Sequence, residues 1–90
     1  MRLTETPRGV VVRVVAVEST QAVDPIARRL RDLGFVRDER IRVVAVGPFG
    51  AEPVLVQVGY TRFALRRAEA HRVQVEPADA AAPALAGVPS

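Results

Sequence analysis

Few side chains in this 90-residue sequence could carry out covalent chemistry. Nucleophilic catalysis requires a nucleophile next to a base. The serines are Ser19, in a polar stretch, and Ser90, at the C-terminal end; the single histidine is His71, and there is no cysteine. We therefore expect no enzyme activity.

Glu69 and His71 are the residues that one would first consider as iron ligands. A stable metal site normally takes three or four ligands, each held by a further shell of hydrogen bonds. A chain with one histidine, no cysteine and scattered carboxylates does not offer such a set. We predict no metal site and no cofactor, and we expect His71 to be a solvated residue at a helix end.

The stretch GPFGAEP, residues 47–53, contains two glycines next to an apolar segment. A phosphate-binding loop would continue into Gly-Lys-Ser/Thr and a helix, and this sequence does not. We therefore expect a hairpin loop, whose Pro48, Phe49 and Gly50 form a candidate partner-binding surface. An exposed Phe49 would mark such a surface, whereas a Phe49 folded over the end of a barrel would not.

Arg28, Arg29 and Arg31 form a second candidate partner-binding surface. Arginine anchors interfaces through planar, bidentate contacts, although most exposed arginines are only solvated. All 13 basic residues are arginine, and 10 acidic residues are interleaved with them, giving a net charge of +3. Because no block of one sign stands out and aromatic residues are few, we expect no nucleic-acid binding, and we expect Phe63 to belong to the core.

The arginines lie in a segment with clear helix signals. Asp24 is a predicted N-cap and Pro25 occupies the first helical position, where its missing N–H costs nothing. The apolar residues that follow share one helical stripe, and Gly34 is suited to the left-handed conformation that ends a helix. The stripe consists of Ile26, Ala27, Leu30 and Leu33.

Valine-rich segments surround this helix and predict strands, because β-branched residues suit a pleated surface. We expect strands at residues 8–17, 39–46, 54–60, 61–65 and 71–77, and a helical turn at 66–70. In the first strand a period of two places Val12, Val14 and Ala16 on one face and Arg13, Val15 and Val17 on the other.

These elements predict a mainly β fold: a small SH3-like barrel of about five strands, with one short α-helix between the first two strands and a helical turn before the last. We assign residues 1–76 to the barrel and predict that residues 77–90, rich in Ala and Pro, form a disordered tail. No apolar run approaches the roughly 20 residues that span a bilayer, so we expect no membrane insertion.

Several segments together resemble the FeoA family, ferrous iron transport protein A. They are RRLRDLGF, then RIRVV, then GPFGAEPVLVQVGYTRFALRRAEAHRVQV, and the likeness covers residues 3–76. The sequence departs from the family pattern at Arg37 and Asp38, where Pro-Gly is usual, and at Glu52, where Asp is usual.

The resemblance implies an SH3-like barrel and a cytoplasmic accessory protein of bacterial ferrous iron uptake. The implied partner is FeoB, a membrane transporter with a cytosolic GTP-binding region, which the protein would help to assemble or regulate. The same barrel occurs in iron-dependent repressors, so an SH3-like regulatory domain that binds nucleic acid or a transcription regulator is the alternative. We expect a monomer or a weak dimer, since an exposed edge strand can pair with a second copy.

Overall fold

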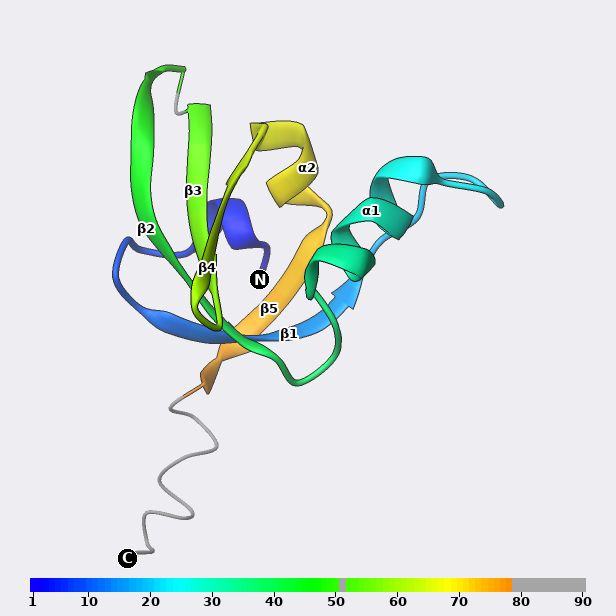
Figure 1. Cartoon of the computed structure of the whole chain (residues 1–90), viewed down its shortest axis with the longest axis horizontal. Helices are drawn as coiled ribbons and strands as arrows, with labels where there is room; N and C mark the ends of the chain where they lie inside the picture. Colours follow the sequence, from blue (N-terminus) through cyan, green and yellow to red (C-terminus); the bar gives the residue numbers. More distant parts are fainter. Residues whose placement is uncertain (51, 79–90) are drawn as a thin grey trace, which may run out of the picture.

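The computed structural model describes residues 1–50 and 52–78. Within these residues the chain forms five β-strands, two α-helices and a short 3-10 helix. In chain order they are η1 (Leu3–Glu5), β1 (Val11–Val17), α1 (Pro25–Leu33), β2 (Arg40–Phe49), β3 (Glu52–Val58), β4 (Thr61–Leu65), α2 (Arg67–His71) and β5 (Val73–Pro77). The strands form one antiparallel sheet of order β4-β3-β2-β1-β5, which curls around the core (Figure 1). The predicted mainly β architecture, including the positions of both helices, is confirmed.

The core is built from the inward-facing residues of every strand, together with α1 and η1. Most are valines, as the composition predicts for a pleated surface. The largest fully buried side chains are Phe35, Leu3, Leu30, Ile41 and Leu65. Val73 and Val75 face inward from β5, as expected from their alternation.

The predicted alternation of inward and outward side chains is wrong in the second half of β1. The register against β5 shifts between Val14 and Ala16, which marks a β-bulge. A bulge adds one residue to one strand and reverses the facing of the residues that follow. Ala16 is therefore exposed and Val17 is buried.

Both predicted ends of α1 are confirmed. The carboxylate of Asp24 accepts hydrogen bonds from the amides of Ile26 and Ala27, at 3.1 and 3.2 Å. Gly34 has a φ of 113°, and the amide of Phe35 donates to the carbonyl of Leu30 at 3.0 Å. This arrangement is a Schellman-type helix end, and it turns the Phe35 side chain into the core, where it is 0 % exposed.

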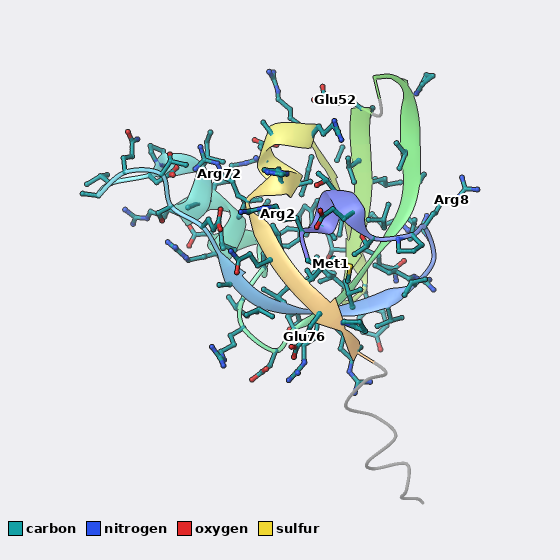
Figure 2. All side chains as sticks on the ribbon, turned by 180° about the vertical axis from the view of Figure 1, so that it is seen from behind. Met1, Arg2, Arg8, Glu52, Arg72 and Glu76 are labelled. Atoms are coloured by element: carbon teal, nitrogen blue, oxygen red, sulfur yellow. The ribbon has the colours of Figure 1, made fainter. Side chains whose placement is uncertain are left out.

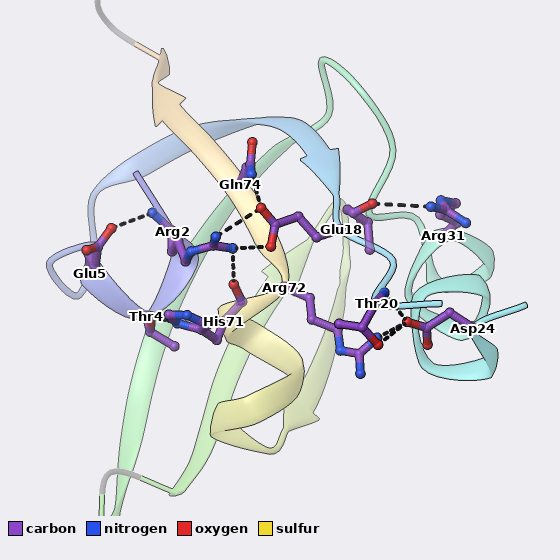
Figure 3. A network of polar contacts seen from close by, with 11 residues as sticks. Arg2, Thr4, Glu5, Glu18, Thr20, Asp24, Arg31, His71, Arg72 and Gln74 are labelled. Atoms are coloured by element: carbon purple, nitrogen blue, oxygen red, sulfur yellow. Dashed lines mark hydrogen bonds and ion pairs between the residues drawn. The ribbon is translucent and has the colours of Figure 1, made fainter. Parts of the chain in front are cut away.

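Asp24 also joins α1 to the rest of the molecule. Its second carboxylate oxygen accepts from the amide and hydroxyl of Thr20, at 2.8 and 3.2 Å, and pairs with the guanidinium of Arg72 (Figure 3). The Thr20 amide above all, then the Ala27 amide and Arg72, hold the pKa of Asp24 well below its ordinary value, although burial opposes the charge.

We therefore expect Asp24 to contribute to acid sensitivity. A carboxylate whose pKa is lowered by folding stabilises the protein above its unfolded pKa of about 4, and that stability is lost as pH falls toward the folded pKa. Asp24→Asn should lower the free energy of unfolding at pH 7 and should flatten its decline below about pH 4. Urea unfolding at a series of pH values measures both effects, and parallel declines for the two proteins would contradict this role.

The β2–β3 hairpin is longer than predicted. Residues 47–53 were expected to form a loop, but β2 continues to Phe49 and β3 begins at Glu52, so Phe49 pairs with Glu52. The register between the two strands is irregular from Val46 to Phe49, which allows Gly47 and Pro48 to lie within β2. The hairpin extends beyond the barrel body in Figure 1.

The N-terminal residues cover the outer edge of β5. Arg2 forms an isolated bridge with Gln74, and the amide of Val75 donates to the carbonyl of Met1 at 2.7 Å (Figure 2). After β5, Ala78 is buried. Most of the predicted tail, residues 79–90, lies outside the described residues. None of the described helices has the length and apolar character needed to cross a membrane.

Candidate partner-docking surfaces

The first predicted surface, Pro48, Phe49 and Gly50, lies at the tip of the β2–β3 hairpin. A hydrogen bond connects the hairpin to α2: the carboxylate of Glu52 accepts from the amide of Arg67 at 2.9 Å. An acceptor at this position satisfies one of the free amides at the start of the helix. Pro48 and Gly50 are exposed, and Gly50 has a φ of 60°, which suits glycine in the tight turn.

Gly47 of β2 lies against Glu52 and Pro53 of β3, with no room for a side chain. A Cβ atom at this position would collide with the backbone carbonyl of Glu52 and would lie 2.6 Å from Pro53 Cδ. The absence of a side chain therefore allows the hairpin to close, and through Glu52 it also allows the contact with α2. The sequence pattern predicts Gly47 in a loop, because this constraint arises only once β2 and β3 are paired.

The second predicted surface is on α1, where the three arginines have different surroundings. Arg29 pairs with Glu69 of α2 at 3.1 Å, and Arg31 donates to the carbonyl of Val17 and to the Ser19 hydroxyl at 3.2 and 3.1 Å. Arg28 is exposed and has no ion pair or side-chain hydrogen bond within residues 1–50 and 52–78. Arg29 and Arg31 therefore hold α1 in place, and Arg28 is available to a partner.

Arg28 and Arg31 also border a hollow of about 310 Å³ between α1 and the segment that precedes it. Its other lining residues are Ser19, Ala22, Val23, Asp24 and Pro25. Val23 is 80 % exposed, so an apolar side chain lies beside two cations. This combination is typical of interface cores, where apolar contacts and arginine occur together.

The different surroundings predict different effects on stability. Arg31→Ala should lower the free energy of unfolding by about 0.5–1 kcal/mol, because its hydrogen bonds to the last residue of β1 and to Ser19 are lost. Arg28→Ala should change it by less than about 0.5 kcal/mol, as for most surface substitutions. Chemical denaturation of both variants measures the difference, and equal losses would show that Arg28 also supports the fold.

The structure does not bring the two surfaces together. In Figure 1, α2 lies between the β2–β3 hairpin and α1. Glu52 contacts α2 from the hairpin side, and Glu69 of α2 pairs with Arg29 on the other side. Glu69 additionally accepts from the amide of Arg66 at 2.9 Å, which completes the start of α2. This is the Glu half of a capping box; the other half, a Ser or Thr at the N-cap, is replaced here by Arg66.

His71 lies at the exposed end of α2, as predicted. Its Nδ1 is 3.2 Å from the Thr4 hydroxyl, and its carbonyl accepts from Arg2 at 2.9 Å (Figure 3). Arg2 also pairs with Glu18 at 2.7 Å, and chiefly this hydrogen bond lowers the pKa of Glu18 below its ordinary value. Among the described residues, no three His, Cys, Asp or Glu side chains gather closely enough to hold a metal ion.

The aromatic residues after the hairpin differ in exposure. Phe63 is half-buried and its ring lies 6.3 Å from that of Phe35, so the prediction that Phe63 packs with the core is confirmed. Tyr60, in the turn between β3 and β4, has a relative exposure of 106 %.

The chain is similar to known proteins in both sequence and fold. The model of the FeoA domain matches residues 1–77. A similar solved structure is that of Stenotrophomonas maltophilia FeoA, described as an SH3 domain protein complexed with zinc. It is 56 % identical, the match covers 84 % of this chain and 89 % of that one, and the TM-score is 0.77. The barrel is therefore SH3-like.

Two further structures extend the comparison. The iron(II) transport protein A of Clostridium thermocellum is 29 % identical with a TM-score of 0.76; the match covers 88 % of this chain but only 46 % of that one. A manganese-dependent transcriptional repressor is 22 % identical over 86 % of this chain and 41 % of its own, with a TM-score of 0.72, and shares the fold alone. The comparison with curated proteins finds no match.

Proposed function

The chain belongs to the FeoA family of ferrous iron transport accessory proteins, and from this premise we propose that it docks on the FeoB transporter from the cytoplasmic side and assembles or regulates it. The observation that carries the proposal is the match over residues 1–77. The S. maltophilia relative supports it, because its structure is described as that of a candidate ferrous iron transport activating factor.

The proposed mechanism is docking and not catalysis. The hairpin tip (Pro48–Gly50) is one contact, and Arg28 with the hollow beside it is the other. A few anchors supply most of the binding energy of an interface, and arginine is enriched among them. Since α2 is bonded to both the hairpin and α1, a partner that contacts both surfaces would meet them in a fixed relation.

Affinity measurements on single variants test this mechanism. The cytosolic region of FeoB is immobilised, and binding of the parent protein, Arg28→Glu, Phe49→Ala and Arg66→Glu is compared. We expect Arg28→Glu and Phe49→Ala to weaken binding by about tenfold or more, the range of interface anchors. Arg66→Glu makes the same charge change at an exposed site outside both surfaces and should have little effect. Equal weakening by all three would count against a specific surface.

Metal binding is the second candidate function, because the S. maltophilia relative was crystallised with zinc. The described residues of this chain do not fit a resident site, since Glu69 is held by Arg29 and no third ligand joins His71. Titration with zinc and ferrous ions, followed by NMR and thermal unfolding, tests this function. An increase in melting temperature that His71→Ala abolishes would favour metal binding over docking alone.

A further inference from the structure

The outward face of the sheet carries a row of arginines that neither docking surface includes. Cross-strand pairing places Val11, Arg42, Gln57 and Arg62 side by side on β1, β2, β3 and β4. Arg40 lies two residues before Arg42 on the same face of β2, opposite Arg13 of β1. Ile41 and Val43 point to the other side and are buried, which confirms that Arg40 and Arg42 face outward.

Most of these charges are not compensated. Arg13 pairs with Asp38 at 3.1 Å and with Glu76, and Arg62 donates to Gln57 at 3.3 Å. Arg40 and Arg42 are exposed and form no ion pair or side-chain hydrogen bond with any residue of 1–50 or 52–78. Arg13, which lies directly opposite Arg40, is compensated by two carboxylates, so Arg40 and Arg42 are left as two uncompensated charges on β2.

The same face is hollowed and has apolar side chains within it. A depression of about 310 Å³ is lined by Val11, Glu39, Arg40, Ile41, Arg42, Gln57 and Gly59. Tyr60 follows Gly59 and is fully exposed. An exposed tyrosine that directly follows a lining residue of a depression with two unpaired arginines matches the composition of interfaces, in which tyrosine and arginine are enriched.

The spacing of the arginines indicates the shape of the ligand. Residues two apart on a strand are separated by about 6.8 Å, which is also the repeat of alternate side chains in an extended peptide. Carboxylates at alternate positions of such a peptide could therefore each meet one guanidinium in a bidentate contact. We propose that this face binds an extended, acidic segment of a protein partner, with its carboxylates on Arg40 and Arg42 and its apolar residues against Val11 and Tyr60.

A protein ligand fits better than a nucleic acid. Glu39 lines the depression and would repel a phosphate chain, whereas a peptide can place an uncharged residue there. Proteins that bind single-stranded nucleic acid use several aromatic side chains on which the bases stack. On this face Tyr60 alone is exposed among the described aromatics, because Phe63 packs against the core. The inference is independent of docking on FeoB.

The test uses a synthetic nine-residue peptide with alternating glutamate and threonine, titrated into the isotope-labelled full chain. A peptide of the same composition in which no two glutamates are two positions apart (Glu-Glu-Thr-Thr-Glu-Glu-Thr-Thr-Glu) and an oligothymidylate of equal charge are the comparison ligands. We expect the alternating peptide to bind most tightly and to shift the amide signals of residues 40–42 and 57–60. Arg40→Gln and Arg42→Gln should each weaken it about tenfold, the effect of one lost charge-assisted hydrogen bond.

Arg66→Gln removes one exposed charge elsewhere and should weaken binding less than twofold, while Glu39→Gln should strengthen it. Equal weakening by Arg66→Gln and Arg42→Gln would overturn the proposal in favour of non-specific attraction. No binding of the alternating peptide would also overturn it. Tighter binding of oligothymidylate that depends on Arg42 would assign the face to nucleic acid instead. The amide spectrum of each variant confirms that it is folded.

Discussion

Phe35→Ala should lower the free energy of unfolding by about 3–5 kcal/mol, the range measured when a buried phenylalanine is truncated. The ring is fully buried, lies against Phe63 and enters the core at the point where α1 ends. Its loss leaves a cavity that the surrounding strands cannot close, because each is fixed by pairing on its neighbours. Small domains have total stabilities of about 5–15 kcal/mol, so the variant should be close to unfolding at 37 °C.

Urea unfolding followed by circular dichroism measures this loss. Val36→Ala is the matched control, since Val36 is the next residue and is 46 % exposed; it should cost less than about 0.5 kcal/mol. A loss below about 1 kcal/mol for Phe35→Ala would show that the core can repack around the missing ring, contrary to the close packing of protein interiors.

Gly47→Ala should have the second-largest effect. It should lower the stability and also change the local structure. The added methyl group would collide with backbone atoms of Glu52, and backbone cannot move aside as a flexible side chain can. We expect a loss of about 1–3 kcal/mol, as for other insertions into packed positions. Because Glu52 holds the start of α2, the displacement should also reach the amide of Arg67.

NMR amide shifts separate this effect from simple backbone strain. Gly9→Ala is the control, because Gly9 has a φ of 86° but open space around its Cα. Its signals should change near residue 9 only, whereas Gly47→Ala should change those of Glu52 and Arg67. If the Arg67 signal is unchanged in a folded Gly47→Ala protein, the hairpin does not position α2.

The parts of the fold that depend on local sequence could be predicted. Asp24, Pro25 and Gly34 act within a few residues of their own position, so the bounds of α1 follow from the chemistry of its ends. Val73 and Val75 alternate without interruption, and their burial follows from the period of two. The order of strands and helices along the chain follows from the valine-rich segments and the helix signals between them, and the family resemblance implies the SH3-like barrel.

The parts that depend on distant residues could not be predicted. The bulge in β1 becomes visible only against β5, where the register shifts between Val14 and Ala16. The hairpin reaches Phe49 because pairing with Glu52 outweighs the turn preference of glycine and proline. Arg29 meets Glu69 forty residues away, so no local pattern distinguishes it from Arg28. Charge alone therefore identified the arginine surface but not which arginine is available.

Titration of the isotope-labelled protein with the unlabelled cytosolic region of FeoB tests the central proposal most directly, with and without a GTP analogue. We expect amide shifts that cluster at residues 47–50 and around Arg28, and none on addition of a mixed single-stranded nucleic acid. Shifts with the nucleic acid and not with FeoB would contradict docking on FeoB and favour a regulatory domain.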